Sequence, residues 1–252
     1  MSLFEKNLIK YFWQFFYKKF SFIYLYTNND FNLKEIMILK TIILFLSILI
    51  SLNIFSNEIS DKNKIIQKYQ KMNLEKEIEL KTFFRAINGY EKINDKKTNI
   101  LTIIDYSKPS LEKRFYVIDL EKEKVLYSTY VMHGKNSGDN YTTEFSNILN
   151  SYKSSPGFYK TSNAYYGQFG YALKLNGLEK GINDNAFKRA IVLHGSKYAY
   201  PIPKTTMLSK SLGCPAIPME LVKPVINKIK NGSILYIHTN KSDYIDNSKY
   251  SI

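Results

Sequence analysis

A change in the spacing of apolar residues near Asn99 is the strongest constraint on the fold of this 252-residue chain. From there to residue 239, short runs of β-branched and aromatic residues alternate with clusters of Gly, Asn, Asp, Ser and Pro, which is typical of strands joined by turns. Six runs predict strands, at 100–105, 114–120, 124–133, 171–175, 189–194 and 233–239. The chain is therefore expected to contain one mainly β (α+β) domain.

Helices are predicted on both sides of this region. Residues 58–97 are rich in Lys and Glu and carry apolar residues at helical spacing, so they should form one or two helices. A later helix at 219–230 should end at Asn231-Gly232, the usual stop signal. The remaining residues, 241–252, are predicted to form a polar tail.

An uncharged apolar run lies near the N-terminus. Residues 41–57 follow Lys40 and contain no charged side chain, so 37–57 has the order of a secretory signal peptide. The run is short for a membrane span, which needs about 20 apolar residues. No A-x-A-like cleavage site is present, so an uncleaved N-terminal anchor stays open beside a cleaved signal. Either reading predicts export.

Residues 1–36 are unusual in front of such a signal. Met37 stands where a signal peptide would normally begin, so 1–36 are one candidate for a non-native extension. In the alternative, residues 1–25 form a basic, aromatic amphipathic helix on the membrane surface.

The chain is basic, with 36 Lys and Arg against 22 Asp and Glu and a net charge of +14. Such a charge favours an anionic partner, for example nucleic acid, lipid head groups or an acidic wall polymer. The lysines are scattered, however, and Lys, Ile, Asn and Tyr are all abundant, which indicates a coding bias. No nucleic-acid partner is predicted. A hydrophobic content of 44% excludes a largely disordered chain.

The residues most indicative of chemistry are Cys214, the single cysteine, and His194, twenty residues before it. His194-Gly195 ends a predicted strand, and the cysteine ends a Gly-containing turn at 211–214. A thiol attacks as the thiolate and needs a neighbouring imidazole to take its proton, while backbone N–H groups can hold an oxyanion. Each residue alone has a simpler interpretation, because a lone His or Cys is usually a buried structural side chain.

These residues resemble the L,D-transpeptidase catalytic domain family, whose signature is His-Gly, a spacer and Ser-x-Gly-Cys. The similarity covers about residues 80–240 and is closest to a divergent murein L,D-transpeptidase branch with Ser-x-Gly-Cys-Pro. It also includes VMHGKNSG (131–138), FSN (145–147), SSPGFY (154–159), YGQFGY (166–171) and LEKGINDNAFKR (178–189). The resemblance implies an L,D-transpeptidase-like β-sandwich or partly closed barrel over 98–240, with flanking helices and a helical N-terminal segment.

The resemblance also implies roles for the site residues. Cys214 would be the acylated nucleophile, His194 the general base, and Gly195 the source of a carbonyl that orients the imidazole. Gly213 and Cys214 would offer N–H groups to the oxyanion, and Ser211 would support the turn. No cofactor is expected.

The chain departs from the better-known branch at two positions. Leu212 replaces a His, and Ala216 replaces an Arg or Asn. Without that Arg, recognition of the peptide carboxylate falls to another cation. The substrate-binding candidates are the cations Lys135, Arg189 and Lys197, together with His133, Gly134 and Ser137. His133 either faces the cleft as a second imidazole or caps its turn.

The resemblance implies an exported enzyme of the periplasm or cell envelope, acting as a monomer on peptidoglycan stem peptides. It would form a thioester with a stem peptide and pass it to an amine or to water. The alternatives are an L,D-carboxypeptidase, a catalytically inactive wall-binding envelope protein on the same scaffold, and a membrane-surface protein that depends on its basic N-terminal segment. A metal site is not expected, because the spacings of His133, His194 and Cys214 fit no compact metal signature.

Overall fold

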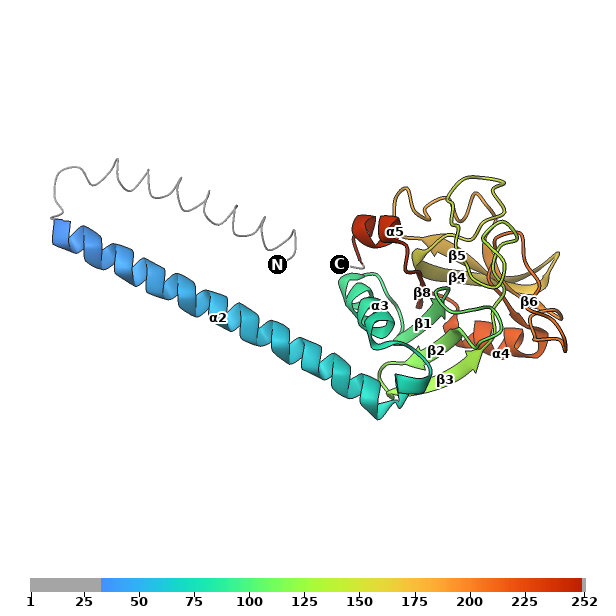
Figure 1. The fold of residues 1–252 in the computed structure, drawn as a ribbon, viewed down its shortest axis with the longest axis horizontal. Helices are drawn as coiled ribbons and strands as arrows, with labels where there is room; N and C mark the ends of the chain where they lie inside the picture. Colours follow the sequence, from blue (N-terminus) through green and yellow to red (C-terminus); the bar gives the residue numbers. More distant parts are fainter. Residues whose placement is uncertain (1–32, 251–252) are drawn as a thin grey trace. The chain divides into compact units, whose positions relative to one another are not determined.

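The computed structural model of the protein describes residues 33–250, which fall into two compact units, one ending at Asp61 and one starting at Lys62 (Figure 1). The helix α2 (Leu33–Lys71) contains both the predicted signal or anchor at 37–57 and the start of the predicted helical segment. From Met37 to Lys71 it is long and apolar enough to cross a membrane, because an 18-residue window in it has a mean hydropathy of 2.3. The amphipathic helix predicted at 1–25 lies outside the described residues.

The second unit is built on one eight-stranded sheet in the order β3-β2-β1-β8-β4-β5-β6-β7. The strands are β1 (Ile100–Asp105), β2 (Phe115–Asp119), β3 (Lys124–Thr129), β4 (Gly157–Gly167), β5 (Gly170–Gly177), β6 (Val192–Ser196), β7 (Ala216–Pro218) and β8 (Ile234–His238). Met132, just past edge strand β3, bridges to Ala216 in the other edge strand, β7. The sheet is therefore a nearly closed barrel, and the prediction of a mainly β, partly closed barrel is confirmed.

Two strands were absent from the sequence prediction. The first is β4, the longest strand, which joins β8 to β5 at the centre of the sheet. Its second half is largely exposed, and its register shifts between Thr161 and Ala164, so its sequence lacks a clear alternation. The second is β7, whose three residues are too few to produce a periodic pattern.

The helices of this unit cover both faces of the sheet. A short 3-10 helix, η1 (Leu74–Lys76), precedes α3 (Leu80–Lys92), whose buried residues share a core with Leu101 and Ile103 of β1. The helix α4 (Met219–Ile229) joins the other core, which includes Ile100 and Ile104 of the same strand. Because alternate residues of a strand point to opposite faces, both faces of β1 are buried.

The C-terminal segment, expected as a polar tail, packs onto the barrel within the described residues. It forms α5 (Ser242–Asn247), and Tyr244 is only 5% exposed. The buried carboxylate of Glu179 accepts hydrogen bonds from the hydroxyls of Ser248 and Tyr244 and from the Phe158 N–H at 2.7 Å. One buried side chain thus joins this segment to the first residues of β4.

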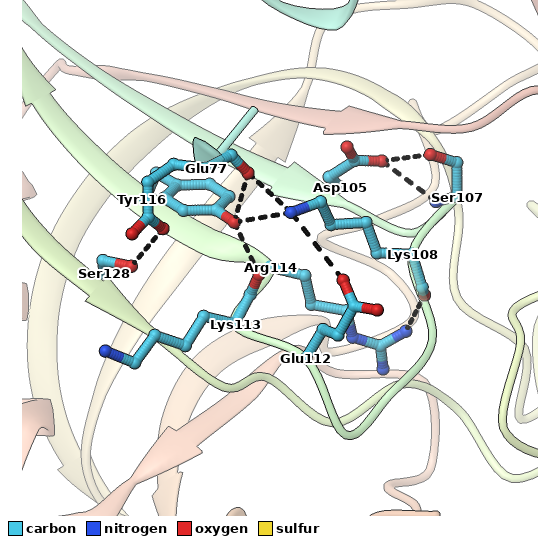
Figure 2. A network of polar contacts seen from close by, with 9 residues as sticks. All are labelled: Glu77, Asp105, Ser107, Lys108, Glu112, Lys113, Arg114, Tyr116 and Ser128. Carbon is cyan, nitrogen blue, oxygen red and sulfur yellow. Dashed lines mark hydrogen bonds and ion pairs between the residues drawn. The ribbon is translucent and has the colours of Figure 1, made fainter. Parts of the chain in front are cut away.

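A polar network joins the chain before α3 to the β1–β2 connection (Figure 2). The carbonyl of Glu77 accepts from Lys108 Nζ at 2.5 Å and from the Tyr116 hydroxyl at 2.7 Å. The Lys108 carbonyl in turn accepts from Arg114 Nη1 at 3.1 Å. The Arg114 side chain is fully buried and also donates twice to the Val131 carbonyl. A buried charge bonded to neutral acceptors thus supports the segment that follows β3 and leads to residues 132–134.

Candidate active site

A cavity of about 480 Å³ is lined by both Cys214 and His194. Strand β6 pairs in parallel with β7, with His194 opposite Ala216, and the His194 N–H lies 3.3 Å from the Pro215 carbonyl to which it donates. This pairing brings the end of one strand beside the turn that precedes the other. The sheet register therefore places both residues on one cavity.

Cys214 is 8% exposed, and its thiol bonds to the backbone of the neighbouring strand region. The Val192 N–H donates to Sγ at 3.4 Å, and the thiol donates to the Ala190 carbonyl at 3.6 Å. Burial raises the pKa of the thiol, while the Val192 N–H and the charge of Arg189 act in the opposite direction. The resting group is thus a protonated thiol.

The His194 imidazole is held by its own strand. Nδ1 lies 3.0 Å from the Gly195 carbonyl, so a proton on Nδ1 makes a hydrogen bond and leaves Nε2 as the basic nitrogen. The Phe169 ring stacks on the imidazole with centroids 4.5 Å apart and an interplanar angle of 21°. Burial lowers the pKa of His194, partly offset by the Gly195 carbonyl, so the ring is neutral at neutral pH.

The turn before Cys214 depends on close backbone contacts. Gly213 has φ +120°, and a Cβ on Gly134 would lie 2.9 Å from the Gly213 Cα. Ser211 Oγ accepts the Gly213 N–H at 3.1 Å and donates to the Cys214 carbonyl at 2.6 Å. The Gly213 N–H, one of the two donors expected for an oxyanion, is therefore already bonded inside the turn. Within residues 33–250, the Cys214 N–H has no hydrogen-bond acceptor.

The His133 segment lies behind this turn. His133 Nδ1 is 2.8 Å from Arg114 Nη2, and Nε2 is 3.2 Å from the Gly138 carbonyl. Burial, with the Arg114 charge, lowers the pKa of His133 to about 4, so the ring is neutral and donates from Nε2. His133, Gly134 and Ser137 do not line the cavity. Of the two interpretations left open for His133, this geometry fits the one in which it caps the turn.

Arg189 is the one predicted substrate-binding cation that lines the cavity. Nη1 donates to the Ser146 carbonyl at 2.6 Å and to Ser155 Oγ at 3.1 Å, and Nη2 to Ser151 Oγ at 3.2 Å and the Lys153 carbonyl at 2.5 Å. All four acceptors are neutral. The guanidinium therefore connects the 146–155 loop to the cavity wall, and no carboxylate within residues 33–250 bonds to it.

The other two predicted cations lie outside the lining of the cavity. Lys135 Nζ lies 4.2 Å from the ring centre of Tyr152, and Lys197 Nζ lies 5.0 Å from that of Tyr198. Both tyrosines line the cavity. No arrangement of three or more His, Cys, Asp or Glu side chains among residues 33–250 could hold a metal ion.

Several site residues were not predicted from the sequence. Gln168 and Phe169 form the two-residue tip of the β4–β5 hairpin and reach the cavity. The Gly167 and Gly170 pair around them was a local signal for this turn. Ser154 had no such signal, because its bonds reach Gly134 and Gly213, which are distant in sequence.

The family comparison covers most of the second unit. Residues 74–238 match the model of the L,D-transpeptidase catalytic domain. No curated protein sequence matches the chain.

Solved structures with a similar fold include three bacterial proteins of low sequence identity. An L,D-transpeptidase from Mycobacterium smegmatis is 10% identical with a TM-score of 0.36, and the match covers 56% of this chain and 59% of that one. An L,D-transpeptidase from Stackebrandtia nassauensis is 15% identical with a TM-score of 0.34, and the match covers 71% of this chain and 77% of that one. The helical cell shape determining protein Pgp2 from Campylobacter jejuni is 14% identical with a TM-score of 0.40, and the match covers 64% of this chain and 55% of that one. The chain thus spans less than two thirds of the first and third of these proteins.

Proposed function

The chain belongs to the L,D-transpeptidase catalytic domain family, and from this we propose that it is a cysteine-dependent L,D-transpeptidase of peptidoglycan. The observation that carries the proposal is the cavity lined by both Cys214 and His194, since it brings a residue with a thiol and a residue with a neutral imidazole to one site. Peptidoglycan stem peptides are the substrate class typical of this family.

In the first half of the reaction, the Cys214 thiol gives its proton to His194 Nε2, and Sγ attacks the carbonyl of an L-residue joined to D-alanine. In the resting structure that proton points to the Ala190 carbonyl, so the thiol must leave this bond before attack. The oxyanion accepts from the Cys214 N–H. The carbon–nitrogen bond then breaks, His194 protonates the departing amine, and a thioester remains on Cys214.

In the second half, an amine of a neighbouring stem peptide attacks the thioester and forms a cross-link. His194 takes the proton of the attacking amine and returns it to the sulfur as the thiol leaves. Water in place of the amine gives an L,D-carboxypeptidase by the same chemistry.

The proposal is tested with Cys214→Ala and intact-mass spectrometry after incubation with muropeptides or a carbapenem. The wild type should gain the mass of an acyl adduct, and the variant should gain none while keeping its circular dichroism and Tm, because removing the thiol leaves the main packing in place. An adduct that persists in the variant would contradict the assignment of the nucleophile.

A catalytically inactive wall-binding protein is the second candidate, favoured by the buried thiol that bonds to backbone rather than to the imidazole. It predicts no acyl adduct on the wild type and an iodoacetamide rate no higher than that of an ordinary free cysteine. An adduct on Cys214 excludes this candidate.

We also propose that α2 directs export, either as a cleaved signal or as an anchor in the membrane of the cell envelope. Its polar side chains Thr41, Ser47 and Ser51 bond to helix carbonyls three or four residues earlier, which lowers their cost in a lipid environment. The full chain should remain in the membrane fraction after carbonate extraction, or N-terminal sequencing should find a chain that begins after the apolar run at 41–57. A full-length chain that fractionates as a soluble protein would contradict both forms of the proposal.

A further inference from the structure

Ser154 is a buried residue, 1% exposed, in the connection between β3 and β4. Its Oγ accepts the Gly134 N–H at 3.0 Å and donates to the Gly213 carbonyl at 3.2 Å. Its own N–H donates to Ser137 Oγ at 2.8 Å. A single hydroxyl thus connects the His133-Gly134 segment to the turn that presents the nucleophile.

The bond to the Gly213 carbonyl determines the direction of the next N–H. The Gly213 carbonyl and the Cys214 N–H belong to one peptide unit, which is planar and trans, so the two groups point in opposite directions. Gly213, at φ +120°, lies in a region of backbone conformation open mainly to glycine, where the peptide plane can rotate with little steric cost. A hydrogen bond that fixes the Gly213 carbonyl therefore also fixes the direction of the Cys214 N–H.

Ser211 Oγ accepts the Gly213 N–H, whereas the Cys214 N–H has no acceptor within the described residues. Ser211 also fixes the Cys214 carbonyl, at 2.6 Å. The peptide units on either side of the Cys214 Cα are therefore each held by a serine hydroxyl. Ser154 holds the one that carries the N–H nearest to the nucleophile.

We propose that Ser154 is a positioning residue that aims the Cys214 N–H at the oxyanion of the acyl-transfer intermediate. The inference rests on the proposed function of Cys214 as nucleophile. It assigns a role to a buried serine that touches neither the substrate nor the sulfur.

The test compares two reactions of the same thiol in the full-length Ser154→Ala variant. Acylation by a carbapenem passes through an oxyanion, whereas alkylation by iodoacetamide displaces iodide and forms none. Loss of an oxyanion donor costs about 10²- to 10³-fold in rate, so a misdirected donor should slow acylation at least about tenfold. The iodoacetamide rate should stay within about twofold of the wild type, because the ionisation of the thiol is unchanged.

Matched variants separate this role from a structural one. Ser154→Thr and Ser154→Val have nearly the same shape and differ in the hydroxyl, so Thr should keep the acylation rate and Val should lose it, even where Ala fails to fold. Ser233→Ala removes another fully buried serine, bonded to the Ile229 carbonyl at 2.5 Å, and should leave the ratio of the two rates unchanged.

Three outcomes are decisive against the inference. Equal slowing of acylation and alkylation in Ser154→Ala would indicate a general effect on the thiol. Equal acylation by the Thr and Val variants would show that the hydroxyl has no part. A wild type that is alkylated but never acylated would instead overturn the proposed function, and the inference with it.

Discussion

The backbone N–H of Val192 donates to the sulfur of Cys214 at 3.4 Å, from the same strand that carries the candidate base. This bond favours the thiolate, whereas burial favours the thiol and raises its pKa. Burial also lowers the pKa of His194. The two side chains therefore rest as a neutral pair, in contrast to the thiolate–imidazolium pair of many cysteine enzymes, and the base must act during the reaction.

His194→Ala is expected to slow acylation most near neutral pH. There the wild-type imidazole is neutral and accepts the thiol proton, while the variant must wait for the small fraction of thiol ionised by solvent. As the pH rises from about 6 to 9, that fraction grows and the two rates should converge. Carbapenem acylation rates across this range test the expectation. Equal rates for wild type and variant throughout would contradict the assignment of the base.

Arg189→Gln should make the thiol less reactive at neutral pH. The positive charge of Arg189 opposes the effect of burial on the pKa of Cys214, so removing it raises that pKa further. Each unit of pKa lowers the thiolate fraction about tenfold, and iodoacetamide rates against pH measure the shift.

Arg189→Lys is the matched control, because it keeps the charge and cannot keep the four loop bonds of the guanidinium. Both variants should lower Tm, but the thiol pKa should rise clearly in the glutamine variant alone. The same pKa in both variants would mean that the loop bonds, rather than the charge, affect the thiol.

The fold was predictable where burial produces a regular pattern. The strand at 100–105 was found with its observed bounds because all six residues of β1 are buried and apolar or β-branched at most positions. In contrast, β4 was missed although it is central, because residues 163–167 are exposed or only partly buried, and of these only Ala164 and Tyr165 pack against the core. Pairing with β5 stabilises this part of the strand, and local amino-acid composition does not reveal such pairing.

Residues of the candidate site could be proposed from the sequence where the signal is local. His194-Gly195 and the turn at 211–214 are recognisable locally, and one strand pairing brings them together. Arg114 gave no local signal, since a single buried cation cannot be distinguished from many solvated ones by sequence. Its partner His133 lies 19 residues away, and the two buried side chains meet only in the folded chain.

His133 should make the fold sensitive to acid. Its folded-state pKa is about 4, while an unfolded histidine has a pKa near its ordinary value of about 6.5. Above the unfolded pKa both states are neutral and the stability is complete. As the pH falls from about 6.5 to about 4, the unfolded chain binds a proton that the folded chain excludes, and roughly 3 kcal/mol is lost.

His133→Gln tests this expectation, because its amide can still accept from Arg114 and donate to the Gly138 carbonyl but does not titrate. Urea unfolding at several pH values should give a free energy of unfolding that falls less steeply with acid in the variant. The difference between the two slopes should correspond to at most one proton bound on unfolding. His194 and His238 also have lowered pKa values, so part of the slope should remain. An unchanged slope would mean that His133 is protonated in the folded protein, and a charged ring facing the Arg114 guanidinium could not keep Nδ1 as the acceptor of that bond.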